Sequence, residues 1–434
     1  MSLHFLQTIK LRFFKNKEEE LKFLILALCA FFLMGAQWPI KILKDGWLIS
    51  ELGASKQPFM RVISVISCFL VSLVYSQLVN IFRREVVIYL ISFLLSLLGI
   101  AFYGLFSLQA IGFSLLSKSF MVKAFYLYAD VFAVLTLPSF WAFVNDITTP
   151  QEAARGYGLV FFAAQFGALI SVLASHFLSS RSQSTLILLV STSFLIIFAA
   201  LIFGLMRKVN KNYLLGYEVR VAHHKAADQP TSFWRGLHLV LASSYVAGIF
   251  FLTLAPDLLI SVITFKWFEI VEKSFPDNKN AAVTFMFDYA ILVQIVSCIF
   301  SLLSGLFFAA LGLRNCITMY PIGLLACVIF MHFFPTLWIV TIGLAIIRGL
   351  HYALNKQARE GLYIPTTKDV KYKAKAWIEM FGSRIFKATG SSICKLPTIF
   401  ANSFLFFLPM VWVFVALFLG KRYNESINNK ETVI

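Results

Sequence analysis

The 434-residue chain is too apolar for an ordinary soluble protein, because 59% of its residues are hydrophobic, 14% are charged and the mean hydropathy is +0.80. Its formal charge of +17 could suggest a nucleic-acid-binding protein, but the basic residues are scattered between apolar runs and do not gather on a soluble module. The composition therefore predicts a polytopic membrane protein embedded in a lipid bilayer and argues against nucleic acid as a partner.

Windows of about 19 residues predict twelve membrane-spanning helices. The first is expected to stay in the mature chain, because a basic segment precedes it and many more apolar runs follow. Pro256 is a candidate break in the seventh, and the low hydropathy of the eleventh favours a buried, cavity-lining position. The expected spans are 22–43, 59–80, 86–107, 123–145, 157–180, 184–206, 236–265, 282–308, 316–335, 336–356, 372–394 and 398–420.

One long polar stretch, 207–235, divides the twelve expected helices six and six. It predicts an N-terminal six-helix bundle over 1–206, a cytoplasmic linker and a C-terminal six-helix bundle over 236–434. An N-terminus in the cytoplasm puts most of the 38 Lys and Arg residues on that side, which predicts that both termini are cytoplasmic. His223 and His224 in the linker fit an exposed polar loop better than a metal site, so no metal or cofactor is expected.

The two halves also echo each other in sequence. Thr148 follows the fourth expected span and Thr366 the tenth, 218 residues later, and the same spacing relates Asp130 to Arg348. Together with the twelve spans and the central linker, this predicts an all-α membrane protein of the major-facilitator type, built as a parallel repeat. Such a fold places its solute site near the membrane midplane.

Lys41 and Lys44 lie where lipid or protein interior is expected. A lysine near the bilayer centre costs roughly 2.5–3.5 kcal/mol on insertion scales, and two lysines three residues apart share one side of a helix. An anionic solute is the simplest compensation, and Asp45 and Gly46 follow at once. The alternative is that both lysines extend to the headgroup layer from the end of the helix.

Two motifs stand in the first half of the chain, IKILKDG at 40–46 and YADVFAVLTLPSFWAFVNDITTPQEAARGYGL at 128–159. They resemble LRDTKD and AELWGSV…FWGFANEIT…EAKRFY of the nucleotide transporter family, the ADP/ATP translocases of obligate intracellular bacteria and of plastids. Lys41 and Lys44 take the family's Arg and Lys, Asp130 takes its intramembrane Glu, and Asn145 matches as it stands.

Two further motifs in the second half also resemble the family: ITFKW at 263–267, similar to EVTWK, and EGLYIPTTKDVKYKAKAWIEMFGSRIFKATGSSI, which ends at Ile393. In the region from Arg348 onward, Arg348 and His351 fall on two family lysine positions. Ile42 and Val262 each replace an acidic residue of the family. The resemblance implies a nucleotide site formed by Lys41, Lys44, Asp130, Asn145, Arg348, His351, Glu379, Arg384 and Lys387.

Several of these residues have a structural alternative. Arg384 and Lys387 could pair with Glu379, and Asp130 could pair with Arg348 at the same depth. Asp257 is a further candidate counter-charge. Aromatic residues could stack an adenine ring, although most are expected to be packing residues: Trp38, Trp47, Phe125, Tyr126, Tyr128, Trp141 and Trp377.

Two classes of function follow. The first is a carrier with alternating access, most directly exchanging ATP for ADP, with proton-coupled import of a nucleotide, NAD or another anionic metabolite as its variant; Asp130, Glu379 or His351 would then titrate. The remote second class is a membrane enzyme acting on lipid phosphates. Motifs for phosphate hydrolysis, metalloproteases, serine hydrolases and paired cysteines are missing from the sequence, so no enzymatic activity is expected. We expect a monomer in a bacterial inner membrane.

Overall fold

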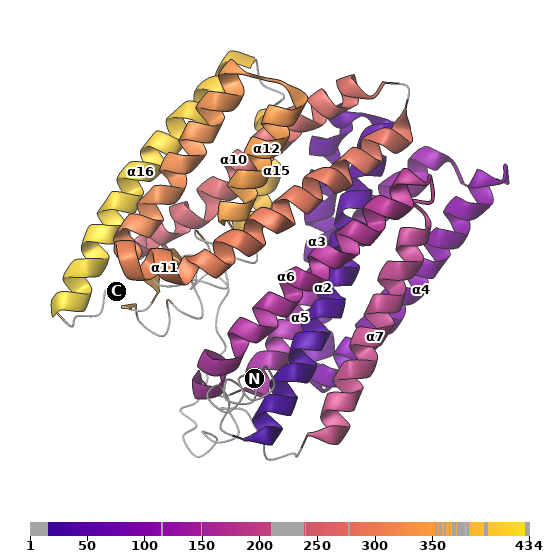
Figure 1. Ribbon diagram of the computed structural model, residues 1–434, viewed down its shortest axis with the longest axis horizontal. Helices are drawn as coiled ribbons and strands as arrows, with labels where there is room; N and C mark the ends of the chain where they lie inside the picture. The colour runs from indigo at the N-terminus through magenta and orange to yellow at the C-terminus, as the bar shows by residue number, and fades with distance from the viewer. Residues whose placement is uncertain are drawn as a thin grey trace, which may run out of the picture. The chain divides into compact units, whose positions relative to one another are not determined.

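In a computed structural model the residues that the structure describes are almost entirely α-helical (Figure 1). The structure describes residues 16–113, 116–148, 150–209, 238, 240–276, 278–351, 382–394 and 398–429, together with isolated positions between 355 and 378. The predicted linker therefore lies outside the described residues except for its first three positions. So do Glu379 and Trp377.

The described residues divide into two compact units. The first unit comprises residues up to Glu51, then Ile66–Ala227 and the short segment Val283–Phe287. It contains α4 (Arg84–Ala110), α5 (Lys118–Asp146), α6 (Pro150–Ser180) and α7 (Leu186–Lys208), nearly all of α2 (Lys17–Leu52) and most of α3 (Gln57–Ile81).

The second unit comprises Leu52–Val65, Asp228–Ala282 and Asp288–Ile434. Its helices are η1 (Ala54–Lys56), α10 (Ser244–Ser274), most of α11 (Lys279–Phe333), α12 (Leu337–Leu350), α15 (Ser383–Ile393) and α16 (Thr398–Asn429). Within it, α10 is the central helix and packs against α12, α15 and α16.

Ten helical segments of the described chain are long and apolar enough to cross a membrane. The predicted eighth and ninth spans join in α11, where Gly312 has a non-helical backbone with φ 72°. Within the described residues the tenth begins as α12, and the eleventh is described only in α15. The break predicted at Pro256 is wrong, because α10 continues through this residue.

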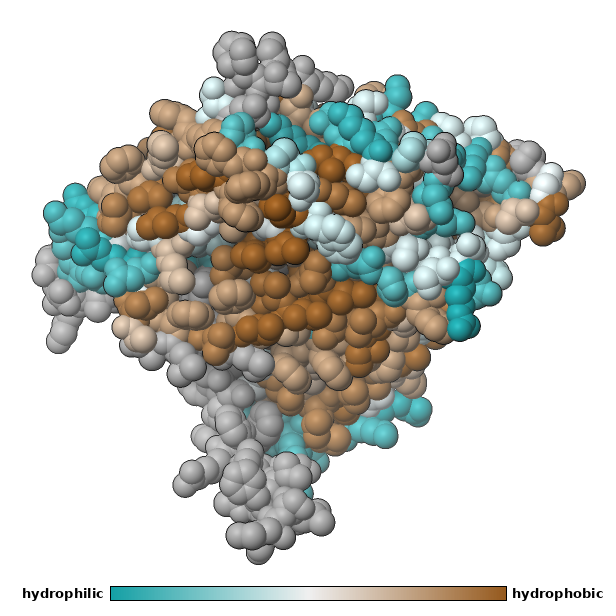
Figure 2. Space-filling view, turned by 45° about the horizontal axis from the view of Figure 1, so that its top comes forward, coloured by the Kyte–Doolittle hydropathy of each residue, from teal (hydrophilic) through white to brown (hydrophobic). Residues whose placement is uncertain are grey.

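Large apolar side chains cover much of the molecular surface (Figure 2). Phe93 on α4 and Phe407 and Phe414 on α16 are examples, each about two-thirds exposed or more. In water such a surface would drive aggregation, whereas in a bilayer it contacts lipid chains that are equally apolar. The exposed surface therefore agrees with the prediction of an integral membrane protein.

Glycines allow close helix contacts in both units. A Cβ atom on Gly167 of α6 would lie 2.2 Å from the Phe31 carbonyl oxygen of α2, and one on Gly390 of α15 would lie 2.6 Å from the Leu258 carbonyl oxygen of α10. Backbone atoms cannot move aside as a flexible side chain can. These two glycines let α2 and α10 contact their neighbours directly, as small residues do in membrane helix pairs.

Candidate functional site

Lys44 is held by a carboxylate inside the first unit. Its Nζ lies 2.7 Å from Asp130 Oδ1 on α5 and 3.7 Å from Asp45 Oδ1, and 4.3 Å from the centre of the Tyr126 ring. Lys44 is 7% exposed. Since a lysine that extends to headgroups would be exposed, this geometry favours the interpretation of Lys44 as an interior charge.

The length of α2 explains why Lys44 lies inside the protein. At 36 residues the helix is about 54 Å long, so Lys44, eight residues before its end, is about 12 Å inside it. Asp130 lies near the middle of α5. The sequence had suggested a helix end near residue 43, but apolar residues continue beyond Gly46 and keep the helix buried to Ile49.

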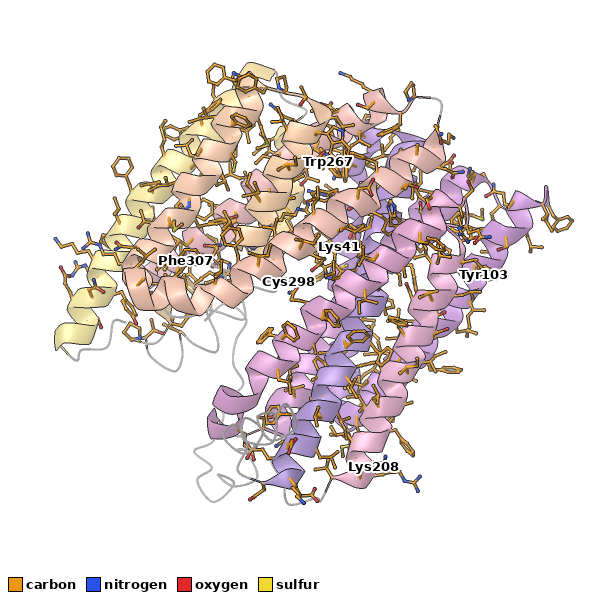
Figure 3. The ribbon with its side chains drawn as sticks, in the orientation of Figure 1. Lys41, Tyr103, Lys208, Trp267, Cys298 and Phe307 are labelled. Carbon is orange, nitrogen blue, oxygen red and sulfur yellow. The ribbon has the colours of Figure 1, made fainter. Side chains whose placement is uncertain are left out.

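Lys41 lies one turn before Lys44 on α2 (Figure 3). Its Nζ is 4.3 Å from the centre of the Trp38 ring, a cation–π distance, and the side chain is half-buried. An aromatic face stabilises a cation without neutralising it. Lys41 can therefore still attract an anion while it rests on Trp38.

The aromatic residues near Lys44 form a packed cluster. The Trp47 ring lies 4.3 Å from Phe106 and 4.9 Å from Phe125, which joins α2 to α4 and α5. Phe125 is fully buried, and the Tyr128 hydroxyl donates to the Leu95 carbonyl at 3.0 Å. These rings therefore pack around the ion pair of Lys44 and Asp130, which is the structural role expected for most of the aromatic residues.

Arg348 is the corresponding charge in the second unit. Its Nη2 donates to Thr264 Oγ1 on α10 at 3.0 Å, and its guanidinium lies 5.7 Å from the centre of the Tyr289 ring on α11. Three helices thus meet at this side chain. In the sequence repeat, Arg348 on α12 stands at the position that Asp130 has on α5, and α10 corresponds to α2. The charge at this position is therefore positive in the second unit and negative in the first.

Lys387 on α15 pairs with Asp257 on α10, with Nζ 3.3 Å from Oδ1. The Lys387 side chain is 51% exposed, so this pair is open to exchange with another anion. Asp257 was a candidate counter-charge in the sequence, and it is the carboxylate that this structure places beside Lys387. The alternative partner, Glu379, lies outside the described residues.

His351 lies at the end of α12, where its Nδ1 is 3.2 Å from Asn355 Nδ2 and its ring 5.9 Å from that of Tyr320. It belongs to a cluster inside the second unit. For Asn145 and Arg384 the structure describes the helix position only, on α5 and α15 respectively.

A buried ion pair that the sequence analysis missed lies at the other end of α2. Lys22 is 0% exposed, and its Nζ contacts Glu152 Oε2 at 2.9 Å and the Ile147 carbonyl oxygen at 3.1 Å. These contacts tie the turn between α5 and α6 to α2. The sequence signal was weak, since Lys22 stands at the edge of an apolar run where lysines usually reach water.

Comparison with known proteins decides the family. Residues 3–111 and 105–421 match the family model described as TLC ATP/ADP transporter. The chain belongs to this family. Relatives include the ADP,ATP carrier protein 1 of Rickettsia prowazekii, 23% identical with 95% of each chain covered, and the ADP,ATP carrier protein 4 of Rickettsia bellii, 25% identical with 95% of this chain and 92% of the relative covered.

Solved structures of transporters share the fold of this TLC-family chain. A variant of the nucleoside transporter NupG is similar with a TM-score of 0.60 at 11% identity, covering 94% of this chain and 99% of that one. A POT family transporter in complex with 5-aminolevulinic acid has a TM-score of 0.62 at 12% identity, covering 93% and 96%. The predicted major-facilitator-like, all-α membrane fold is thereby confirmed.

Proposed function

We propose that this chain is a membrane carrier that exchanges ATP for ADP by alternating access, and that Lys44 contacts the nucleotide phosphates. The observation that carries the proposal is the buried pair of Lys44 and Asp130, about 12 Å inside the end of α2. Relatives over nearly the whole chain are named ADP,ATP carrier proteins, which supports the same substrate class here.

The energetics of such a pair favour a functional role. Replacing a buried ion pair by well-packed apolar residues is often neutral or stabilising by about 1–4 kcal/mol. Leucines in place of Lys44 and Asp130 would therefore support folding about as well as the ion pair does. A nucleotide phosphate brings its own negative charges and can replace Asp130 as the partner of Lys44. When the nucleotide leaves, Asp130 pairs with Lys44 again.

The second unit carries cations of its own that the proposal also assigns to phosphate binding. Arg348 can grip phosphate oxygens in bidentate fashion, and Lys387 offers a movable point charge. Lys41, Asn145, His351, Arg384 and Glu379 belong to the same proposal on their sequence positions. A di- or triphosphate needs several such cations, because its desolvation is otherwise too costly.

The proposal also covers orientation and assembly. The excess of Lys and Arg in alternate loops supports a multi-pass protein with both termini in the cytoplasm, in a bacterial inner membrane. The carrier acts as a monomer on solutes and performs no hydrolysis of its own, so the nucleotide gradients drive net movement.

Uptake by purified protein in lipid vesicles tests the substrate. Vesicles loaded with ADP receive labelled ATP, ADP, GTP, CTP, NAD or inorganic phosphate, with protein-free vesicles as the control. We expect ATP and ADP to enter fastest and to compete with each other. Rapid uptake of NAD or phosphate with no entry of ATP or ADP would contradict ATP/ADP exchange.

A further inference from the structure

Gln294 on α11 is a completely buried amide that the proposed phosphate site does not use. It is 0% exposed, and neither its Nε2 nor its Oε1 has a hydrogen-bond partner among the described residues. Ser297, one turn later and 1% exposed, has a hydroxyl in the same condition. Native proteins rarely leave buried amide groups unsatisfied, since each one costs free energy, so an unpaired amide indicates a partner from outside the chain.

The position of Gln294 is near Arg348. A Cβ atom on Gly349, the residue after Arg348, would lie 2.3 Å from Val296 Cγ1 and 3.3 Å from the Ser297 backbone nitrogen. The Arg348 guanidinium also contacts Tyr289, five residues before Gln294 on α11. Gln294 is therefore on the stretch of α11 that packs against the Arg348 end of α12, about one turn before Cys298, which Figure 3 labels.

Among the described residues Gln57 is a second buried glutamine without hydrogen-bond partners, and it differs from Gln294 in its distance from a helix end. Gln57 is also 0% exposed with both amide atoms unsatisfied, but it is the first residue of α3 and directly follows the exposed Lys56 of η1, where water can reach a helix end. Gln294 is 15 residues into α11, about 22 Å along the helix. Only a solute or a trapped water reaches that depth.

The chemistry of a carboxamide fits the base of an adenine nucleotide, the substrate class of the proposed function. One edge of Gln offers a donor and an acceptor side by side, the arrangement that pairs with the 6-amino group and an adjacent ring nitrogen of adenine. Phosphate offers acceptors only and would leave Oε1 unsatisfied. A ribose hydroxyl fits one amide atom but does not explain both.

We propose that Gln294 recognises the base of the transported nucleotide, with its Nε2 donating to a purine ring nitrogen and its Oε1 accepting from the 6-amino group. Ser297 lies beside it and contributes a second polar contact. This inference rests on the proposed nucleotide transport. It adds that selectivity for adenine lies on α11 of the second unit.

The test compares Gln294→Leu with the matched control Gln57→Leu in ADP-loaded vesicles. Apparent affinities are measured for ADP and for its analogue lacking the 6-amino group, purine riboside diphosphate. In the wild type we expect ADP to bind on the order of ten-fold more tightly than the analogue. Gln294→Leu should reduce this ratio to near one, Gln57→Leu should keep it, and Lys44→Ala should weaken both nucleotides by similar factors.

The outcomes separate this inference from the proposed function. If the wild type carries no nucleotide, the proposed function fails and the inference falls with it. If the wild type exchanges nucleotides and Gln294→Leu keeps the wild-type ratio, Gln294 is a structural residue satisfied by trapped water, and the inference alone is overturned. Should Gln294→Leu fold poorly, Gln294→Met, which has a similar length and loses the acceptor for the 6-amino group, must reduce the same ratio for the inference to stand.

Discussion

At the scale of single residues, the pair of Lys44 and Asp130 determines what a mutation at either position means. Considered from the sequence alone, Lys44→Ala should leave folding intact, since it removes a costly cation from the membrane. The structure changes this expectation, because Asp130 loses the partner that lies 2.7 Å away. Functional tests of Lys44 therefore need a variant that removes both charges.

For transport, we expect Lys44→Ala and the double variant Lys44→Ala/Asp130→Asn to lower apparent affinity for ATP by roughly ten to a hundred and fifty times. The physical reason is the loss of a charge-assisted hydrogen bond to phosphate, worth about 1.5–3 kcal/mol. Lys44→Arg should retain part of the affinity. Lys56→Ala, which removes an exposed cation at the end of η1, is the control. Wild-type transport by the double variant at matched expression would exclude Lys44 from the site.

A second residue-scale prediction concerns Lys22, which is fully buried against Glu152. Glu152→Ala leaves this cation without its carboxylate, so we expect the free energy of unfolding to fall by about 3–5 kcal/mol. Glu425→Ala, which removes an exposed carboxylate near Lys421 and Arg422, should change it by less than about 1 kcal/mol. Thermal unfolding of detergent-purified protein measures both. Equal stabilities for the two variants would show that the buried pair contributes nothing.

At the scale of elements, the turn between α2 and α3 is held by backbone geometry and by a carboxylate. Gly53 has φ 83°, a Cβ atom there would lie 2.8 Å from Glu272 Oε1, and the Ala54 N–H donates to Glu272 Oε2 at 2.9 Å. The short helix η1 is thereby fixed to α10 within the second unit. A side chain at Gly53 disturbs the turn and the carboxylate together.

Three glycine variants separate these effects. Gly104→Ala, in open space on α4, should be neutral or slightly stabilising. Gly112→Ala, with φ 88° and open space around it, should cost about 1–2 kcal/mol for the left-handed backbone. Gly53→Ala should cost more than Gly112→Ala, because the new methyl group also displaces Glu272. Equal melting temperatures for Gly53→Ala and Gly112→Ala would contradict a role for Glu272 in holding this turn.

Sequence reasoning recovered the elements unevenly, for physical reasons. Apolar windows located α3, α4, α6 and α7 well, since these helices expose long apolar faces. The predicted ends of the helices were less accurate, because α2 and α10 continue into polar residues whose side chains find partners within the protein. The charge at Lys44 was visible as a cation in an apolar run. Its partner was not, since residues 86 positions apart meet only through the packing of α2 on α5.

At the scale of the whole molecule, the excess of basic residues in alternate loops predicts the orientation in the membrane. In a variant whose native cysteines are replaced, Ser232→Cys in the linker should resist an impermeant thiol reagent added outside intact cells. Ser55→Cys, an exposed position in η1 after α2, should react. Permeabilised cells should label both positions. Labelling of Ser232→Cys from outside intact cells would reverse the proposed topology.

The central claim is that this protein exchanges nucleotides, and a comparison of loaded with empty vesicles tests it most directly. A carrier with several cations in its solute site should reorient poorly without an anion, because the uncompensated charges would cross a low-dielectric interior. We therefore predict rapid uptake of labelled ATP into vesicles loaded with ADP, little uptake into empty vesicles, and no effect of a protonophore. Equal uptake into empty vesicles that collapses when the protonophore is added would contradict exchange and establish proton-coupled import instead.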